Sequence, residues 1–217
     1  MSAELFMVFD VESIGLHGEG FAVGWVVVNR EGRRFEEGCL ACSPELAGGS
    51  LESRKWVDEN VPPIVPSQCA TPRAVRAAFW SAWRKWVDQG AVLVADCAWP
   101  VEARFMALAV EDDIGEREWN GPYPLHDLAS MLLALGRDPL TPTQRLADEL
   151  PAHHPLMDAR QSARQLVEAL GTVRAIYTDV ADCLTWFYEH PSADDAMGFQ
   201  QKRAARLSRQ LRALAKD

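Results

Sequence analysis

The chain has 217 residues, of which 48% are hydrophobic, and it carries a formal net charge of −9 at pH 7. A chain of this size is expected to bury one sizeable core, and its acidity argues against a protein that holds nucleic acid through a basic face alone. No apolar run reaches the roughly eighteen residues that cross a membrane, and the first residues do not resemble a signal peptide, so we expect a cytoplasmic protein. Its five cysteines are odd in number and are expected to be reduced thiols.

The first predicted element is a strand over residues 5–13, and it contains two carboxylates, Asp10 and Glu12, one residue apart. Side chains alternate along a strand, so both acids project from the same face. Neighbouring carboxylates repel each other unless a cation neutralises them, and Mg²⁺ or Mn²⁺ suits clustered oxygen ligands. The pair therefore predicts a cation site, although two solvated acids on an edge strand would give the same pattern.

Two further strands are predicted at residues 21–29 and 34–42, joined by a tight turn, so that the first three strands form an antiparallel meander. The stretch 43–71 is rich in Pro and Gly and is expected to be an irregular excursion with a short helix near residues 53–59. It leads into a helix that Thr71 and Pro72 open and Gly90 ends.

That helix carries Trp80, Trp83 and Trp86 at helical spacing, which is more typical of core residues than of platforms for stacking bases. Residues 91–95 are a continuous apolar run and predict a strand buried on both faces, parallel to the first strand. The remaining predicted helices cover residues 100–110, 128–135, 144–149, a segment ending at 170–171, one around 178–188, and a basic one over 200–216. We expect residues 1–172 to form the main domain and residues 173–217 a helical extension.

Acidic residues recur where these elements end or begin: Asp10 and Glu12, then Asp96 or Glu102, then Asp158. Sheets of α/β proteins bind ligands beyond the carboxyl ends of their strands, so these acids are expected to converge there. Two divalent cations roughly 3.5–4 Å apart need about four carboxylates and catalyse phosphodiester hydrolysis. His153, close to Asp158, would be the general base.

Two motifs resemble the DEDD family of 3′–5′ exonucleases, in the subgroup with a His before the last Asp, on the ribonuclease H-like fold. They are residues 9–16, Phe-Asp-Val-Glu-Ser-Ile-Gly-Leu, and residues 153–159, His-His-Pro-Leu-Met-Asp-Ala. The resemblance implies an α/β fold with a mixed central sheet flanked by helices. It also implies a nuclease that uses two Mg²⁺ or Mn²⁺ ions to release nucleotides from the 3′ end of single-stranded RNA or DNA. Substrate contacts are implied for Ser13, Ile14, Gly15 and Leu16.

The middle motif departs from the family pattern, because no Asp stands at the matching place. Either Glu102 replaces it, or Asp96 reaches the metals from the strand end, and strand-end acids are held more rigidly. Asp127 resembles a family acid but is expected to cap a helix, and His154 is a second candidate base. A catalytically degenerate domain that binds nucleic acid or a protein partner, and an endonuclease on the same fold, are the alternatives. A homodimer remains open.

Overall fold

The computed structural model describes residues 5–64, 68–189 and 197–214. The chain groups into one compact unit within residues 3–167 and another within residues 168–217. All five cysteines are free thiols. Within the described ranges, no helix combines the length and the apolar character needed to cross a membrane.

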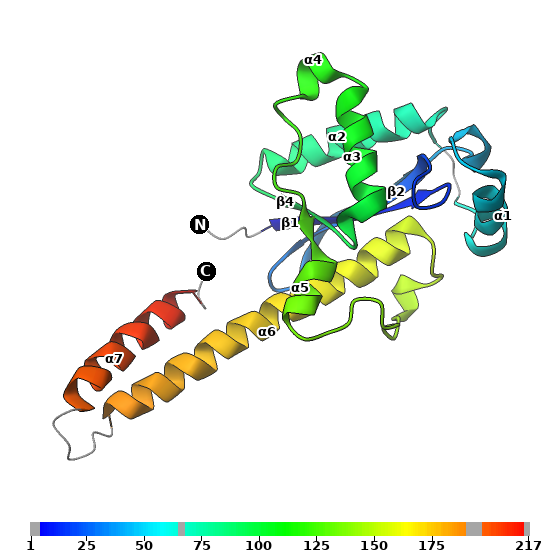
Figure 1. Ribbon diagram of the computed structural model, residues 1–217. Helices are drawn as coiled ribbons and strands as arrows, with labels where there is room; N and C mark the ends of the chain where they lie inside the picture. Colours follow the sequence, from blue (N-terminus) through cyan, green and yellow to red (C-terminus); the bar gives the residue numbers. More distant parts are fainter. Residues whose placement is uncertain (1–4, 65–67, 190–196, 215–217) are drawn as a thin grey trace. The chain divides into compact units, whose positions relative to one another are not determined.

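A sheet of five strands forms the centre of the larger unit, in the order β3-β2-β1-β4-β5 (Figure 1). Its first three strands are antiparallel, whereas β4 runs parallel to β1 and β5 runs parallel to β4. The predicted meander and the predicted parallel strand are therefore confirmed, as is the α/β class with a mixed sheet. The strands are β1 (Leu5–Ser13), β2 (Gly20–Asn29), β3 (Arg34–Ala41), β4 (Val92–Ala95) and β5 (His126–Asp127).

Several helices lie where they were predicted, but α4 was not predicted, and others differ in extent. They are α1 (Leu51–Asn60), α2 (Pro72–Val87), α3 (Ala103–Glu111), α4 (Ile114–Arg117), α5 (Leu128–Ala134), α6 (Pro155–Glu189) and α7 (Met197–Leu214). The start of α2 is capped as predicted, because the Thr71 side chain accepts a hydrogen bond from the Ala74 N–H at 3.1 Å. A π-helical turn, Ala98–Glu102, precedes α3, so the α-helix begins at Ala103 rather than at Pro100.

Helices α2 and α3 lie over one face of the sheet (Figure 1), and aromatic side chains form the core between them and the strands. The ring of Phe79 lies 5.1 Å from that of Phe9 and 5.6 Å from that of Phe105, between centroids. The three tryptophans Trp80, Trp83 and Trp86 are buried, which confirms that they are core residues rather than stacking platforms. The odd-numbered residues of β1 thus face α2 and α3, and the even-numbered ones, including Asp10 and Glu12, face the opposite side.

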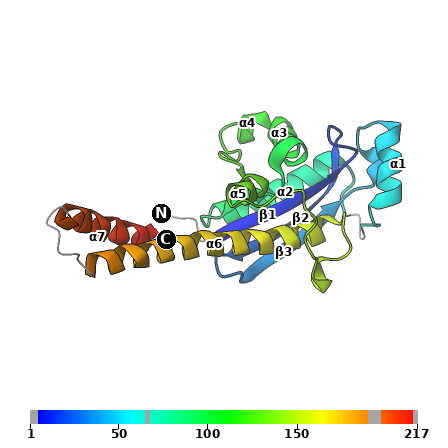
Figure 2. The ribbon, with the colours of Figure 1, turned by 60° about the horizontal axis from the view of Figure 1, so that its bottom comes forward.

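The first turns of α6 cover that opposite face (Figure 2). Gly24 on β2 pairs with Asp10 on β1, and a Cβ built on Gly24 would stand 2.2 Å from the backbone nitrogen of Leu156. The backbone of β2 and the start of α6 therefore approach more closely than any side chain would permit. This contact sets the beginning of α6 beside the even-numbered carboxylates of β1.

Two helix predictions were wrong. The helix expected over residues 144–149 is only a short 3-10 turn, Ala147–Glu149. The helix expected to end at 170–171 continues through Gly171 to Glu189, and so absorbs the separate helix expected around residues 178–188. Gly90 and Gly136 adopt positive φ and follow helix ends, whereas Gly171 does not adopt positive φ. A helical glycine costs only about 1 kcal/mol relative to alanine, which the strong helix formers around Gly171 offset.

The unit within residues 168–217 is a helical hairpin made from the later turns of α6 and from α7 (Figure 1). The Ser208 hydroxyl donates to the Ala181 carbonyl at 2.8 Å and lies 2.6 Å from the Thr185 hydroxyl. Arg212 pairs with Asp182 at 2.7 Å. The predicted basic helix over residues 200–216 thus corresponds to α7, and Lys216 lies outside the described residues.

Candidate metal centre

Strand register brings the first acids together at one edge of the sheet. Phe9 of β1 is paired with Ala95 of β4, so Asp10 and Asp96 directly follow neighbouring positions of parallel strands. Ala95 is in turn paired with Asp127 of β5. Because the carboxyl ends of parallel strands share one edge, three acids from distant parts of the chain stand side by side there. The convergence predicted for the strand ends is therefore present for Asp10 and Asp96.

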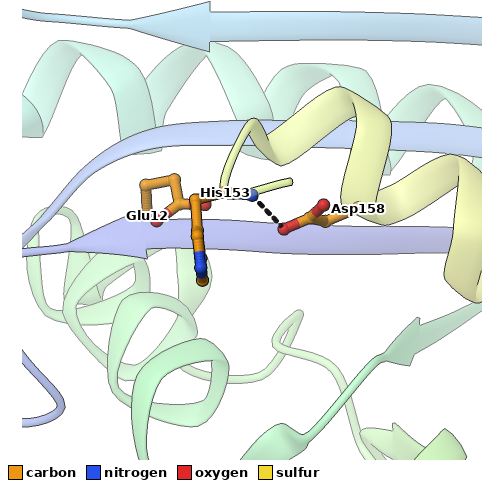
Figure 3. Close-up of side chains that lie close together, drawn as sticks. All are labelled: Glu12, His153 and Asp158. Carbon is orange, nitrogen blue, oxygen red and sulfur yellow. Dashed lines mark hydrogen bonds between the residues drawn. The ribbon is translucent and has the colours of Figure 1, made fainter. Parts of the chain in front are cut away.

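A carboxylate, an imidazole and a second carboxylate meet beside this edge (Figure 3). Glu12, His153 and Asp158 each offer a ligand atom, and these atoms all lie within 4.8 Å of one another. Glu12 is buried on β1, His153 is exposed in the loop before α6, and Asp158 lies in the first turn of α6. Oxygen and imidazole nitrogen ligands at this separation are able to share one metal ion.

The loop before α6 is held in a fixed conformation. The backbone N–H of His153 donates to Asp158 Oδ2 at 3.1 Å, and the Asp158 N–H donates to the His154 carbonyl at 2.9 Å. His153 adopts φ of 58°, a left-handed conformation that is uncommon for a residue with a side chain. Trp56 of α1 packs against the His153 ring edge to face, with centroids 5.2 Å apart. The imidazole is therefore placed from both its backbone and its ring.

Asp10 carries the strongest sign of crowded negative charge. The pKa of its carboxyl is raised well above the usual value, first because the protein around it excludes water and then because Glu12, Glu102, Asp158 and Asp96 are negatively charged neighbours. We call these five acids, Asp10, Glu12, Asp96, Glu102 and Asp158, the carboxylate cluster. All the acids that the sequence singled out as metal ligands therefore act on one another in the folded chain.

Glu12 and Glu102 show the same effect. Burial raises the pKa of Glu12 to about 8, and the negative charges of Asp158 and Glu102 add to the rise. Burial also raises the pKa of Glu102 to about 8, although backbone N–H groups, that of Val11 among them, partly offset it. Both side chains prefer to stay protonated near neutral pH unless a cation replaces the protons. A site made of hard oxygen ligands with surplus negative charge fits Mg²⁺ or Mn²⁺.

Both candidates for the middle acid belong to the carboxylate cluster. Glu102 influences Asp10 more strongly than Asp96 does, and it also acts on Glu12. Its Oε1 is 3.4 Å from the Val11 nitrogen, from which it accepts a hydrogen bond. Burial raises the pKa of Asp96, and a hydrogen bond from Ser162 opposes that rise. Both acids therefore act on Asp10, and Glu102 does so more strongly.

Asp127 lies next to the carboxylate cluster, but both of its carboxylate oxygens accept hydrogen bonds from backbone N–H groups. Its Oδ2 accepts from the Ser130 N–H at 3.0 Å, and its Oδ1 accepts from the Ala98 N–H at 3.0 Å. The predicted helix cap is confirmed, because the first of these bonds caps α5. The strand that contains Asp127, β5, was not predicted, since two residues carry no hydrophobic pattern.

Arg145 is the residue of the site that sequence reasoning missed. Its Nη1 donates to Asp158 Oδ1 at 2.5 Å and to the Glu149 carbonyl at 2.9 Å. Burial raises the pKa of both Glu12 and Asp96, and the positive charge of Arg145 partly offsets that rise. Arg145 comes from the stretch where a helix was wrongly expected, and an isolated arginine there gives no signal until the fold brings it to α6.

The stretch that the resemblance assigned to substrate contacts divides into inner and outer residues. Ile14 is buried in the core, whereas the side chain of Leu16 is 66% exposed. The Ser13 hydroxyl donates to the Gly15 carbonyl at 2.9 Å, and Gly15 has φ of 73°. A Cβ on Gly15 would meet the Ser53 side chain, so this turn packs closely against α1. Leu16 is thus the member of the stretch with its apolar surface available to a ligand.

A pocket of about 240 Å³ opens beside the carboxylate cluster. Asp96, Arg145 and Asp158 line one part of it, and polar side chains such as Thr141, Gln161 and Ser162 line the rest.

His154, the second candidate base, is half-buried, and burial lowers its pKa. Among the described residues, no group forms a hydrogen bond with its buried Nδ1. His153 is therefore the imidazole that offers a ligand atom beside Glu12 and Asp158.

In comparisons with known proteins, the chain matched no family model, and no curated protein showed significant sequence similarity to it.

Proposed function

We propose that this protein is a metal-dependent nuclease on a ribonuclease H-like fold, which removes nucleotides from the 3′ end of single-stranded RNA or DNA. The observation that carries the proposal is the gathering of the carboxylate cluster, with His153 beside it, at the carboxyl ends of parallel strands. Isolated surface acids would not raise one another's pKa values in this way. The polarity of cleavage rests on the resemblance of residues 9–16 and 153–159 to 3′–5′ exonucleases.

The carboxylates Glu12 and Asp158 are the groups that would hold a divalent cation, with Asp10 two residues before Glu12 on the same face of β1. A bound Mg²⁺ or Mn²⁺ would acidify a water molecule and stabilise the charge that develops on a phosphodiester. It would also offset the surplus negative charge of the carboxylate cluster, which otherwise repels the phosphate backbone of a nucleic acid. Substrate binding at this site is therefore expected to depend on the ion.

His153 is positioned to accept a proton from the attacking water. Its side chain is exposed, lies within 4.8 Å of the ligand atoms of Glu12 and Asp158, and is held by the Trp56 ring. An imidazole ring nitrogen that is not protonated accepts a proton readily, and imidazoles are the commonest general bases in enzymes. The backbone N–H bond from His153 to Asp158 fixes the imidazole relative to the carboxylate that would hold the ion.

Apolar surface at the rim of the site supports a substrate with unpaired bases. Leu16 is 66% exposed and Trp56 is 46% exposed, and they come from the turn after β1 and from α1, which pack together at Gly15 and Ser53. Base stacking on aromatic or apolar side chains is the usual way in which proteins hold single strands without reading their sequence. A duplex would keep its bases away from this rim.

A second candidate function is binding without cleavage. No Asp stands at the matching place of the middle motif, so the acid there is either Asp96 or the longer side chain Glu102. A site that lacks one strong ligand would hold a metal or a nucleic acid end less effectively and would not hydrolyse it.

The two functions are separated by incubating the protein with 5′-labelled single-stranded oligonucleotides and Mn²⁺. We expect a ladder that shortens one nucleotide at a time from the 3′ end, and at least about a hundredfold slower cleavage in Glu12→Gln. Glu31→Gln, in an exposed turn, is the matched control and should cleave at the normal rate. Internal cuts would indicate an endonuclease, and retention of oligonucleotide without any cleavage would indicate a binding protein.

A further inference from the structure

The side chain of Arg145 provides a positive charge beside the acids of the carboxylate cluster. It lies in the segment between α5 and the 3-10 turn Ala147–Glu149, and its side chain is 22% exposed. Its Nη1 forms two hydrogen bonds, to Asp158 Oδ1 at 2.5 Å and to the Glu149 carbonyl at 2.9 Å. Among the described residues, Arg145 forms no hydrogen bonds other than these two. Its Nε and Nη2 donors are therefore available to another ligand.

The segment that carries Arg145 is attached to α6 on both sides of it. On one side, Thr143 Oγ1 accepts from Gln165 Nε2 at 2.8 Å, and the Gln144 carbonyl accepts from Arg164 at 3.0 Å. On the other side, the fully buried Glu149 pairs with Arg164 at 2.7 Å. The guanidinium is therefore held at its place in the site, and does not lie at the end of a free loop.

Both oxygens of Asp158 already have partners from the chain. Oδ1 accepts from Arg145, and Oδ2 accepts from the backbone N–H of His153. A single ion held between Glu12 and Asp158 leaves this arrangement in place, because a carboxylate oxygen has more than one lone pair. A second divalent cation on the Oδ1 side would lie against the positively charged guanidinium, and like charges a few ångströms apart repel strongly where water is excluded.

Arg145 also faces the space that a substrate would enter. Together with Asp96 and Asp158 it lines the pocket of about 240 Å³ that opens beside the carboxylate cluster. Guanidinium groups bind phosphate through two parallel N–H donors, and Nε and Nη2 of Arg145, which form no hydrogen bond within the described residues, are suited to this. Thr141, Gln161 and Ser162, which line the same pocket, add neutral hydrogen-bonding groups around that position.

We propose that Arg145 takes the place of a second divalent cation: the centre binds one ion, at Glu12 and Asp158, and the guanidinium supplies the other positive charge to the substrate phosphate. The assignment rests on the proposed nuclease function for the identity of the ligand. It departs from the two ions that the resemblance implies, because the guanidinium occupies the Oδ1 side of Asp158, where a second ion would lie.

The first test counts ions on the full-length protein without nucleic acid. Metal-free protein is titrated with Mn²⁺, and free Mn²⁺ is followed by electron paramagnetic resonance. We expect one Mn²⁺ per chain for the native protein and for Arg145→Lys, which keeps the charge. Arg145→Gln should bind two, the first at least about fivefold more tightly, because a nearby positive charge has gone. Arg34→Gln, which removes an exposed arginine paired with Asp148, should behave like the native protein.

The second test uses adenosine 5′-monophosphate as the probe, with one equivalent of Mn²⁺. Arg145→Gln should bind it about tenfold or more weakly, because a charge-assisted hydrogen bond is lost, and Arg145→Lys should recover part of the affinity. Two Mn²⁺ on the native protein, one Mn²⁺ on both native and Arg145→Gln, or equal nucleotide affinity in these two proteins would each overturn the assignment.

The count on the native protein stands even if Arg145→Gln does not fold. Neither measurement involves cleavage, so a protein that shows these results but hydrolyses no oligonucleotide would reject the nuclease function and not the role of Arg145.

Discussion

Two groups of buried charges in the same unit differ in how they are neutralised. In the first, which we call the Arg76 cluster, the guanidinium of Arg76 is 5% exposed and pairs with Asp112 at 2.6 Å and with Glu19 at 2.7 Å. Arg73 lies 3.7 Å from Asp112 and adds a second positive charge. In the carboxylate cluster, Arg145 pairs with Asp158, and its charge also acts on Glu12 and Asp96; no ion pair with Asp10 or Glu102 is found among the described residues.

The difference distinguishes a group of buried charges with a structural role from one that needs an external ligand. Burial of a charge is costly unless a partner lies next to it, and the Arg76 cluster contains its partners within the chain. The carboxylate cluster does not, and the pKa values of Asp10, Glu12 and Glu102 rise in consequence. Surplus buried charge of one sign at the edge of a sheet is therefore the feature that points to an external cation.

The largest loss of stability is expected from disrupting the Arg76 cluster. Arg76→Gln leaves Glu19 without its buried partner and should lower the free energy of unfolding by about 3–5 kcal/mol, measured by urea denaturation. Arg84→Gln removes an exposed pair with Asp88 and should cost no more than about 0.5 kcal/mol. Equal losses in the two variants would show that the Arg76 cluster is not a structural charge group.

The carboxylate cluster should make the stability of the protein depend on pH. Glu12 and Glu102 titrate near pH 8 in the folded chain, far above their ordinary values, so between about pH 5 and 8 the folded state holds protons that the unfolded state has released. The free energy of unfolding of metal-free protein should therefore fall as pH rises, by up to about 1.4 kcal/mol per pH unit for each such proton.

This prediction is checked by urea denaturation at pH 5.5, 6.5 and 7.5 in the presence of a chelator. Glu12→Gln removes one of the titrating groups and should flatten the profile, and Mn²⁺ should flatten it in the native protein by replacing the protons. Stability that is constant or rises over this range would contradict the surplus charge assigned to the carboxylate cluster.

A smaller effect should come from Asp127, which borders the carboxylate cluster but is bonded like a structural residue. Asp127→Ala removes acceptors from the Ser130 and Ala98 N–H groups and should lower the free energy of unfolding by roughly 1–2 kcal/mol. Asp138→Ala, which removes an acceptor from an exposed turn, should change it by about 0.5 kcal/mol or less. If Asp127→Ala proves more stable than the native protein, Asp127 belongs with the repelling acids instead.

Local patterns were sufficient for the elements that such patterns determine. Alternation and apolar runs located β1 to β4, and the cap at Thr71 located the start of α2. They failed where tertiary contacts decide, as at β5, which exists because two residues extend the edge beside β4. Gly171 misled for a related reason, since a glycine ends a helix only where it adopts a left-handed conformation.

The candidate site divides in the same way. Spacing within the chain identified the acids at residues 10, 12, 96, 102 and 158 and the imidazole at residue 153, because each lies at the end or the beginning of a regular element. Arg145 and Trp56 were not found, since one lies in an irregular segment and the other on a short helix. The role of Arg145 depends on its segment packing against α6, and that of Trp56 depends on α1 packing against the turn after β1. No local sequence pattern contains that information.

The absence of a side chain at Gly24 has a consequence for how the site tolerates change. A methyl group there would collide with the backbone at the start of α6, and relief would come by moving the first turn that carries Asp158 away from the strand that carries Glu12. Gly24→Ala should thus open a gap between the two halves of the centre while leaving strand pairing intact.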